Sequence, residues 1–187
     1  MGKDRVFGNI DLYLWQVSGR IDKLILGQKQ LPGFLMSEGE YIKTAHTMML
    51  DFLLKRFTRK GERQMVTSDS LCAALSDLNM EYQATSASWT YKMISEVRFS
   101  GITVQFTEQG DRTSIRVCLP FSSEFSYTPH FSKCRVTGEE FLACLLMIKT
   151  LSDRISTMVA DVYNARLAKA RANRIRRIAS KARRRMQ

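Results

Sequence analysis

The sequence predicts a mostly α-helical protein of the α+β class, in which a small β-hairpin sits in a helical domain and a long carboxyl-terminal helix follows. Apolar residues recur at helical spacing from Leu71 to Leu78 and alternate with polar residues from Ile102 to Leu119, and no proline or glycine follows Gly138. The chain of 187 residues, 44% of them hydrophobic, is long enough to bury a core. We expect four segments: an amino-terminal arm or helix over 1–36, a core domain over 37–136, a long helix over 137–165 and a basic tail over 166–187.

The first third of the chain is expected to be helical. Residues 7–27 fit a helix better than a strand, because the apolar pattern is long. A core helix then begins at Ser37 and Glu40, which have the spacing of a capping box. This helix ends in a basic cluster that either complements the helix dipole or forms a shelf for phosphate groups: Lys55, Arg56, Arg59, Lys60 and Arg63.

Two short helices are expected at the centre of the core domain. The first is capped by Thr67 and closed by Asn79. The second spans Ser86 to Val97. Its buried face would carry Trp89, Met93 and Val97, and its opposite face would carry Ser88, Tyr91 and Lys92.

A β-hairpin follows these helices. Gly110 supplies a positive φ at its tip, and Arg112 and Arg116 lie on the strand that leads away. The order of helix, helix and hairpin resembles the winged-helix class of DNA-binding domains. The resemblance implies that the helix from Ser86 to Val97 enters the major groove, while the two arginines contact the DNA backbone or the minor groove. The aromatic segment 120–134 is expected to be a loop that packs its rings on the core.

The last helix is expected to hold two chains together. Apolar residues recur at alternating three- and four-residue spacing from Phe141 to Ala165, which is typical of a coiled-coil seam. The predicted homodimer interface consists of Ile148, Leu151, Ile155, Met158 and Val162. The same seam could instead pack on an amino-terminal helix of its own chain.

Positive charge is concentrated at the carboxyl end. The chain has 29 lysines and arginines against 18 acids, and the tail holds ten of the cations and no acid. The remaining 165 residues therefore carry 19 cations against 18 acids. Such a tail favours an anionic partner, above all nucleic acid. Its cations are Arg166, Lys169, Arg171, Arg174, Arg176, Arg177, Lys181, Arg183, Arg184 and Arg185.

Several functional classes find no support in the sequence. The phosphate-binding glycine loops, the zinc-protease motif and the nucleophile elbow are all missing, so we expect no enzyme and no small-molecule substrate. The four cysteines form no C-x-x-C pair, so we expect neither a metal site nor a cofactor. No apolar run is long enough to span a membrane, and a cytoplasmic, nucleoid-associated protein is expected.

These observations lead to one main hypothesis and two alternatives. The main hypothesis is a DNA-binding protein of the transcription-regulator or replication-control type, with duplex DNA favoured over RNA as its partner. One alternative is an RNA-binding or ribonucleoprotein factor that uses the arginine-rich tail. The other is a non-enzymatic coiled-coil adaptor whose tail only touches acidic surfaces, including anionic membrane.

Overall fold

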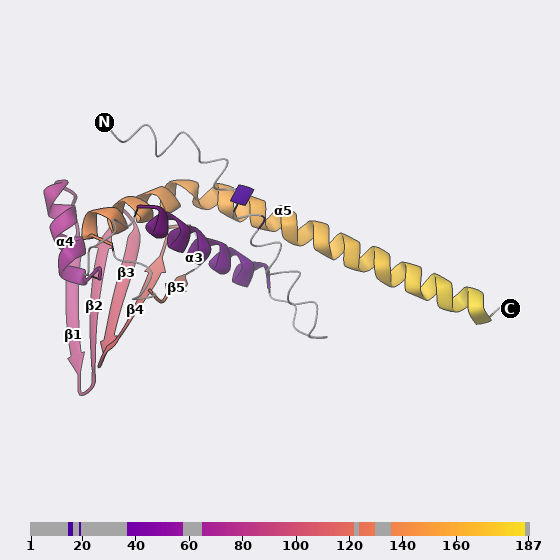
Figure 1. Cartoon of the computed structure of the whole chain (residues 1–187), viewed down its shortest axis with the longest axis horizontal. Helices are drawn as coiled ribbons and strands as arrows, with labels where there is room; N and C mark the ends of the chain where they lie inside the picture. Colours follow the sequence, from indigo (N-terminus) through magenta and orange to yellow (C-terminus); the bar gives the residue numbers. More distant parts are fainter. Residues whose placement is uncertain are drawn as a thin grey trace.

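The computed structural model describes residues 37–57, 65–121, 124–129 and 136–185, together with residues 15, 16 and 19. An antiparallel sheet in the order β1-β2-β3-β4-β5 forms its centre, so each strand pairs with the next one along the chain (Figure 1). The strands are β1 (Gln83–Trp89), β2 (Lys92–Phe99), β3 (Ile102–Gln109), β4 (Arg112–Cys118) and β5 (Phe125–Tyr127). The helices are α3 (Glu38–Phe57), α4 (Ser68–Asp77) and α5 (Gly138–Arg185).

The prediction of a mostly α-helical, winged-helix-like core with one small hairpin is wrong. The segment from Ser86 to Val97, expected to be a helix, is a second hairpin made by β1 and β2. Met93 and Val97 are four residues apart, which suits one face of a strand as well as one face of a helix, whereas Trp89 lies across the turn in β1, opposite Lys92. The turn between the strands, Thr90–Tyr91, has neither the glycine nor the asparagine that commonly marks a hairpin.

Several local signals elsewhere predict the right element, but the segment 120–134, expected to be a loop, contains strand β5, which pairs with β4. The predicted hairpin is β3 and β4, with Gly110 at φ 57°. Helix α4 is capped by Thr67, whose hydroxyl accepts a hydrogen bond from the Ser70 amide, and Asn79 follows it at φ 51°. The Ser37–Glu40 capping box begins α3. The predicted helix over residues 7–27 lies outside the described residues except at 15, 16 and 19.

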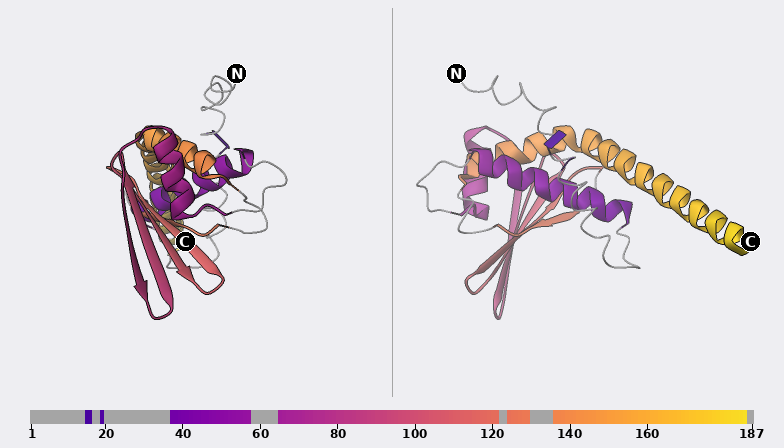
Figure 2. Two further views of the ribbon diagram at one scale, coloured as in Figure 1. Left: turned by 90° about the vertical axis from the view of Figure 1, so that its left-hand side faces the viewer. Right: turned by 45° about the vertical axis from the view of Figure 1, so that its right-hand side comes forward.

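The two faces of the sheet differ in chemistry because side chains alternate along each strand. The inner face carries the row Val97, Val104, Val117 and Phe125, which the strand pairing places side by side. All four side chains are buried. The outer face carries mainly polar and charged side chains, and no described helix covers it (Figure 2).

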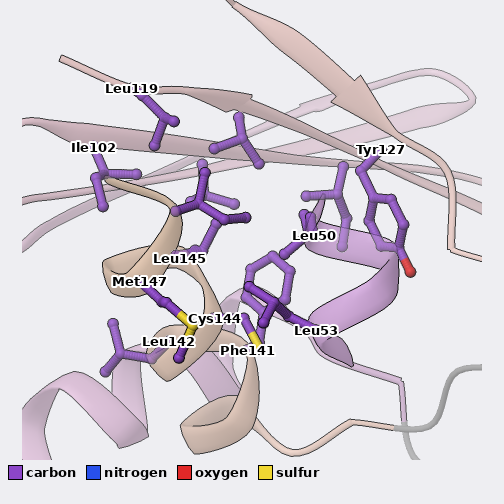
Figure 3. Close-up of a cluster of buried hydrophobic side chains, with 14 of the residues drawn as sticks. Leu50, Leu53, Ile102, Leu119, Tyr127, Phe141, Leu142, Cys144, Leu145 and Met147 are labelled. Atoms are coloured by element: carbon purple, nitrogen blue, oxygen red, sulfur yellow. The ribbon is translucent and has the colours of Figure 1, made fainter. Parts of the chain in front are cut away.

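The core lies between the inner face of the sheet and the helices α3 and α5 (Figure 3). Leu50 and Leu53 of α3 meet Phe141 and Leu145 of α5 in this layer. The Phe106 ring of β3 packs on Phe141, with 6.4 Å between the ring centroids. Apolar burial of this kind is the main source of stability in a single domain.

A glycine sets the approach of α4 to α5. Gly138, the first residue of α5, is buried against the beginning of α4. A Cβ atom at this position would lie 2.0 Å from the carbonyl oxygen of Ser70, so only glycine allows the two helices to come this close.

The apolar seam of α5 packs within its own chain. Ile148 and Ile155 are completely buried and Leu151 nearly so, while Met158 and Val162 are partly buried against the same core. Among the described elements, α3 packs most extensively on α5, whereas the predicted amino-terminal helix lies outside the described residues. The first three residues are therefore already covered within one chain, which leaves little of their surface for a second copy.

Candidate nucleic-acid interface

The most prominent charged feature is the last part of α5. The helix runs without interruption from Gly138 to Arg185, and its buried residues end at Val159. Tyr163 still contacts the body, because its ring packs on Tyr41 with 5.7 Å between centroids. Every residue from Ala168 to Arg185 is exposed, and this part of the helix projects away from the body (Figure 1). The ten tail cations thus lie on one segment, which we call the basic helix (residues 166–185).

The basic helix has three kinds of surface around its axis. At about 100° per residue, one stripe holds Ala168, Ala172, Ile175, Ile178, Ala179 and Ala182, interrupted by Arg171. One flank of this stripe carries Arg174, Lys181 and Arg185, and the other carries Lys169, Arg176 and Arg183. Arg166, Arg177 and Arg184 lie opposite the stripe. A narrow apolar stripe between two cationic flanks suits a groove whose walls are lined by anions.

The three residues expected on a recognition helix lie on the first hairpin instead. Ser88 is in β1, Tyr91 is in the turn, and Lys92 begins β2. All three are exposed at the end of the sheet that extends beyond the helices (Figure 1). No helix is present there to enter a groove, so their predicted role in reading bases from a helix is withdrawn.

The arginines of the sheet lie on its outer face, and two of them form ion pairs with glutamates. The Arg116 Nε atom lies 2.8 Å from Glu124 Oε1, and the Arg98 Nη2 atom lies 2.6 Å from Glu96 Oε1. Both are exposed pairs, which weaken but do not cancel attraction to an anion. Arg112, at the start of β4, is exposed across from Gln109. The pairing of Met93 with Glu108 sets the two hairpin ends beside each other, so Lys92 and Arg112 share one end of the sheet.

The predicted phosphate shelf after α3 can be followed only in part. The Lys55 ammonium group forms an ion pair with Asp51, one helical turn earlier. The structure therefore supports a local structural role for Lys55. Arg59, Lys60 and Arg63 lie outside the described residues.

Sequence reasoning missed two features of the exposed surface. Trp89, expected in the core, is 71% exposed, and Tyr91 beside it is 83% exposed. Ile175 and Ile178 of the basic helix are 66% and 59% exposed. The helical periodicity of the tail contains the signal for the isoleucines, whereas the exposure of Trp89 follows from its position in a strand, which the local pattern does not reveal.

The described residues show little catalytic chemistry. His46 of α3 and Ser152 of α5 are 3.4 Å apart, but both are buried, and no described cluster of acidic, cysteine or histidine side chains is suited to a metal ion. An open cavity of about 610 Å³ lies between α3 and β5. The two cations at its edge, Lys43 and Arg116, stand beside Glu124, which pairs with Arg116.

Comparison with known proteins gives no family model, no curated protein and no solved structure that matches this chain. Within the described residues, each helix is too short or too polar to cross a lipid bilayer. The candidate interface therefore rests on geometry and charge alone.

Proposed function

We propose that this protein is a non-enzymatic DNA-binding protein that grips duplex DNA with its basic helix. The carrying observation is a run of ten cations without an acid on a single helix that leaves the body, and nine of them, from Lys169 to Arg185, are exposed. Each cation that meets a phosphate releases a counterion, so such a helix gains affinity without reading sequence. The sheet and the other helices form the scaffold from which the basic helix projects.

The dimensions of the basic helix favour B-form DNA. A helix with its side chains is about 10–12 Å across, and the major groove of B-DNA is about 12 Å wide. The twenty residues from Arg166 to Arg185 span about 30 Å, comparable with one turn of duplex. The major groove of A-form RNA is too deep and narrow for such a helix, which makes regular RNA duplex the poorer partner.

The distribution of side chains around the basic helix supports one orientation of this helix in the major groove. The cationic flanks would face the phosphates on the two walls, and the alanine–isoleucine stripe would face the floor. Small alanines permit close approach, and Ile175 and Ile178 provide apolar contact for thymine methyl groups. Specificity would be low, because the stripe offers Arg171 as its one strong hydrogen-bond donor. Binding of low specificity by the basic helix replaces the base reading that the sequence suggested for a helix from Ser86 to Val97. Such binding fits association with the nucleoid.

A second candidate function rests on the exposure of Ile175 and Ile178. A helix with cations on its flanks and an apolar stripe also suits an anionic membrane surface. The stripe has only two large apolar side chains, and the rest are alanines. This small apolar area favours DNA over a bilayer, because membrane binding scales with the apolar area that is buried.

The test compares the full chain with a variant in which all six cations of the two flanks are replaced: Lys169→Gln, Arg174→Gln, Arg176→Gln, Lys181→Gln, Arg183→Gln and Arg185→Gln. Fluorescence anisotropy with a random duplex gives the binding constant across a salt series. If all six cations contact phosphates, the slope of log K against log salt becomes shallower by about five, at roughly 0.9 per contact. An unchanged slope would show that the basic helix is not on DNA.

Two controls complete this experiment. The double variant Lys92→Gln, Arg112→Gln removes exposed cations from the sheet, and it should change the slope by less than about two, the limit for two contacts. Two further ligands are tested separately at the same salt concentration. One is a vesicle that contains anionic lipid, and the other is an RNA duplex of the same sequence as the DNA. Tighter binding to the vesicles would favour the membrane function, and tighter binding to the RNA duplex would contradict the preference for B-form DNA.

A further inference from the structure

The two edge strands of the sheet, β1 and β5, differ in length and in how far they are packed. Strand β5 is three residues long, its Phe125 and Tyr127 are buried, and its Ser126 carbonyl accepts a hydrogen bond from Thr47 of α3. Strand β1 is seven residues long and pairs only with β2 among the described strands. All seven of its residues are exposed, so neither face of this strand is packed.

Strand β1 also lacks the features that commonly protect an edge from pairing. Its sequence, QATSASW, contains no charged residue and no proline, and the pairing with β2 runs without a bulge. An unprotected edge presents a row of backbone donors and acceptors to any strand that matches it. The edge of β1 can therefore form backbone hydrogen bonds with another strand.

From this edge we infer that a second copy of the chain pairs with β1 in antiparallel fashion, around a twofold axis at Ser86. In this register Ser86 faces the partner's Ser86, Ala84 faces the partner's Ser88, and Thr85 faces the partner's Ala87. These three kinds of pair are small and uncharged, and the end pair of Gln83 and Trp89 is also uncharged, so no like charges oppose each other. A twofold interface of this kind is the commonest form of homodimer.

The exposed apolar side chains around β1 support the antiparallel direction. Leu78 and Tyr82 are exposed before the strand begins, and Trp89 and Tyr91 are exposed where it ends. Antiparallel pairing brings the beginning of one strand beside the end of the other, so the Trp89 ring would lie opposite the partner's Gln83, on the same face of the joined sheet. The symmetry repeats this contact at the other end, and both ends would bury apolar surface.

The location of this edge is compatible with the rest of the molecule. The seam residues Ile148, Leu151 and Ile155 are buried in their own chain, so they do not compete with β1 for a second copy. Strand β1 is at the side of the sheet away from the direction in which α5 projects (Figure 1). The dimer would form in the free protein, whether or not DNA is bound.

The first test measures the mass of the nuclease-treated full chain in high salt, which removes association through nucleic acid. We expect a species of about 43 kDa, twice the 21.5 kDa of the chain, that dissociates on dilution. Ser86→Lys sets two cations against each other at the twofold axis and should weaken the dimer by about tenfold or more. Ser114→Lys is the matched control, because Ser114 is exposed on the outer face of β4 and should leave the dimer unchanged.

The second test fixes the register. In an antiparallel pair, opposite residues lie about 4.5–5.5 Å apart between Cα atoms, which is within the range of a disulfide. Ser86→Cys should therefore give a covalent dimer on mild oxidation. Ser88→Cys and the unaltered protein, with its native cysteines, should not, because Ser88 faces the partner's Ala84.

Three outcomes would overturn the inference. The first is a chain that stays monomeric at all concentrations, and the second is a dimer that resists Ser86→Lys. The third is equal cross-linking of the two cysteine variants and the unaltered protein. Circular dichroism spectra of the variants verify that each one keeps its fold, which the exposure of Ser86 and Ser88 leads us to expect.

Discussion

The Oγ atom of Ser152 in α5 lies 3.4 Å from the Nε2 atom of His46 in α3, and both residues are buried. The imidazole ring also stacks on Phe125 of β5, with 5.5 Å between centroids. His46 thus joins the two long helices to the edge of the sheet. Its Nδ1 atom has no hydrogen-bond partner among the described residues, and burial lowers its pKa from 6.5 to about 4.

This low pKa predicts a loss of stability in mild acid. Between pH 6.5 and 4, His46 stays neutral in the folded chain but takes up a proton in the unfolded chain. Above pH 6.5 the histidine is neutral in both states and does not reduce stability. The free energy of unfolding falls as the pH decreases from 6.5 toward 4. The loss from this group approaches about 3 kcal/mol.

Urea unfolding at several pH values between 7 and 4 checks this prediction. His46→Gln retains a polar side chain that does not titrate, so its stability should vary less with pH, whatever its stability at pH 7. If the variant and the unaltered protein lose stability in parallel, His46 does not cause the acid sensitivity.

Gly138→Ala should destabilise the protein strongly. The new methyl group would meet the Ser70 carbonyl oxygen, a backbone atom that cannot rotate away, so α4 must separate from α5. We expect a loss of about 3 kcal/mol in the free energy of unfolding, measured by urea denaturation. Gly39→Ala is the control: nothing lies within 4 Å of its Cβ position in α3, and it should stabilise by up to about 1 kcal/mol. Equal effects at both positions would argue against the close approach.

Removal of the basic helix should leave the body folded. A chain that ends at Ala165 retains every buried residue of α5, because the last of them is Val159. Its free energy of unfolding should change by less than about 1 kcal/mol, since residues beyond this point are largely exposed. Thermal unfolding followed by circular dichroism measures this, and a broad, uncooperative transition would show that the basic helix contributes to the core.

Ile155→Asp should unfold the monomer rather than dissociate a dimer. Ile155 is completely buried within one chain, and an aspartate there would have no described cation or solvent to stabilise its charge. A loss of more than about 3 kcal/mol is expected in chemical denaturation. Thr157→Asp, at an exposed position two residues later, should cost little. A folded monomeric Ile155→Asp protein would instead restore the seam as an interface between chains.

The sequence by itself was sufficient for the elements whose signals are local. The capping pair Ser37–Glu40 locates the start of α3, Thr67 locates the start of α4, and Gly110 locates one hairpin turn. Each signal acts through hydrogen bonds or backbone angles within a few residues, so it can be recognised without knowledge of the fold. The concentration of charge beyond Ala165 is equally visible in the sequence, and the exposure of the basic helix agrees with it.

Tertiary structure alone decided the rest. An apolar stripe on α5 requires burial, but the stripe does not specify its partner, and within the chain α3 and the sheet cover it. The segment from Ser86 to Val97 suits two periodicities, and its pairing with β3 over Val97–Val104 makes it part of a sheet. That choice depends on backbone hydrogen bonds to a strand from another part of the chain, and no local pattern contains them.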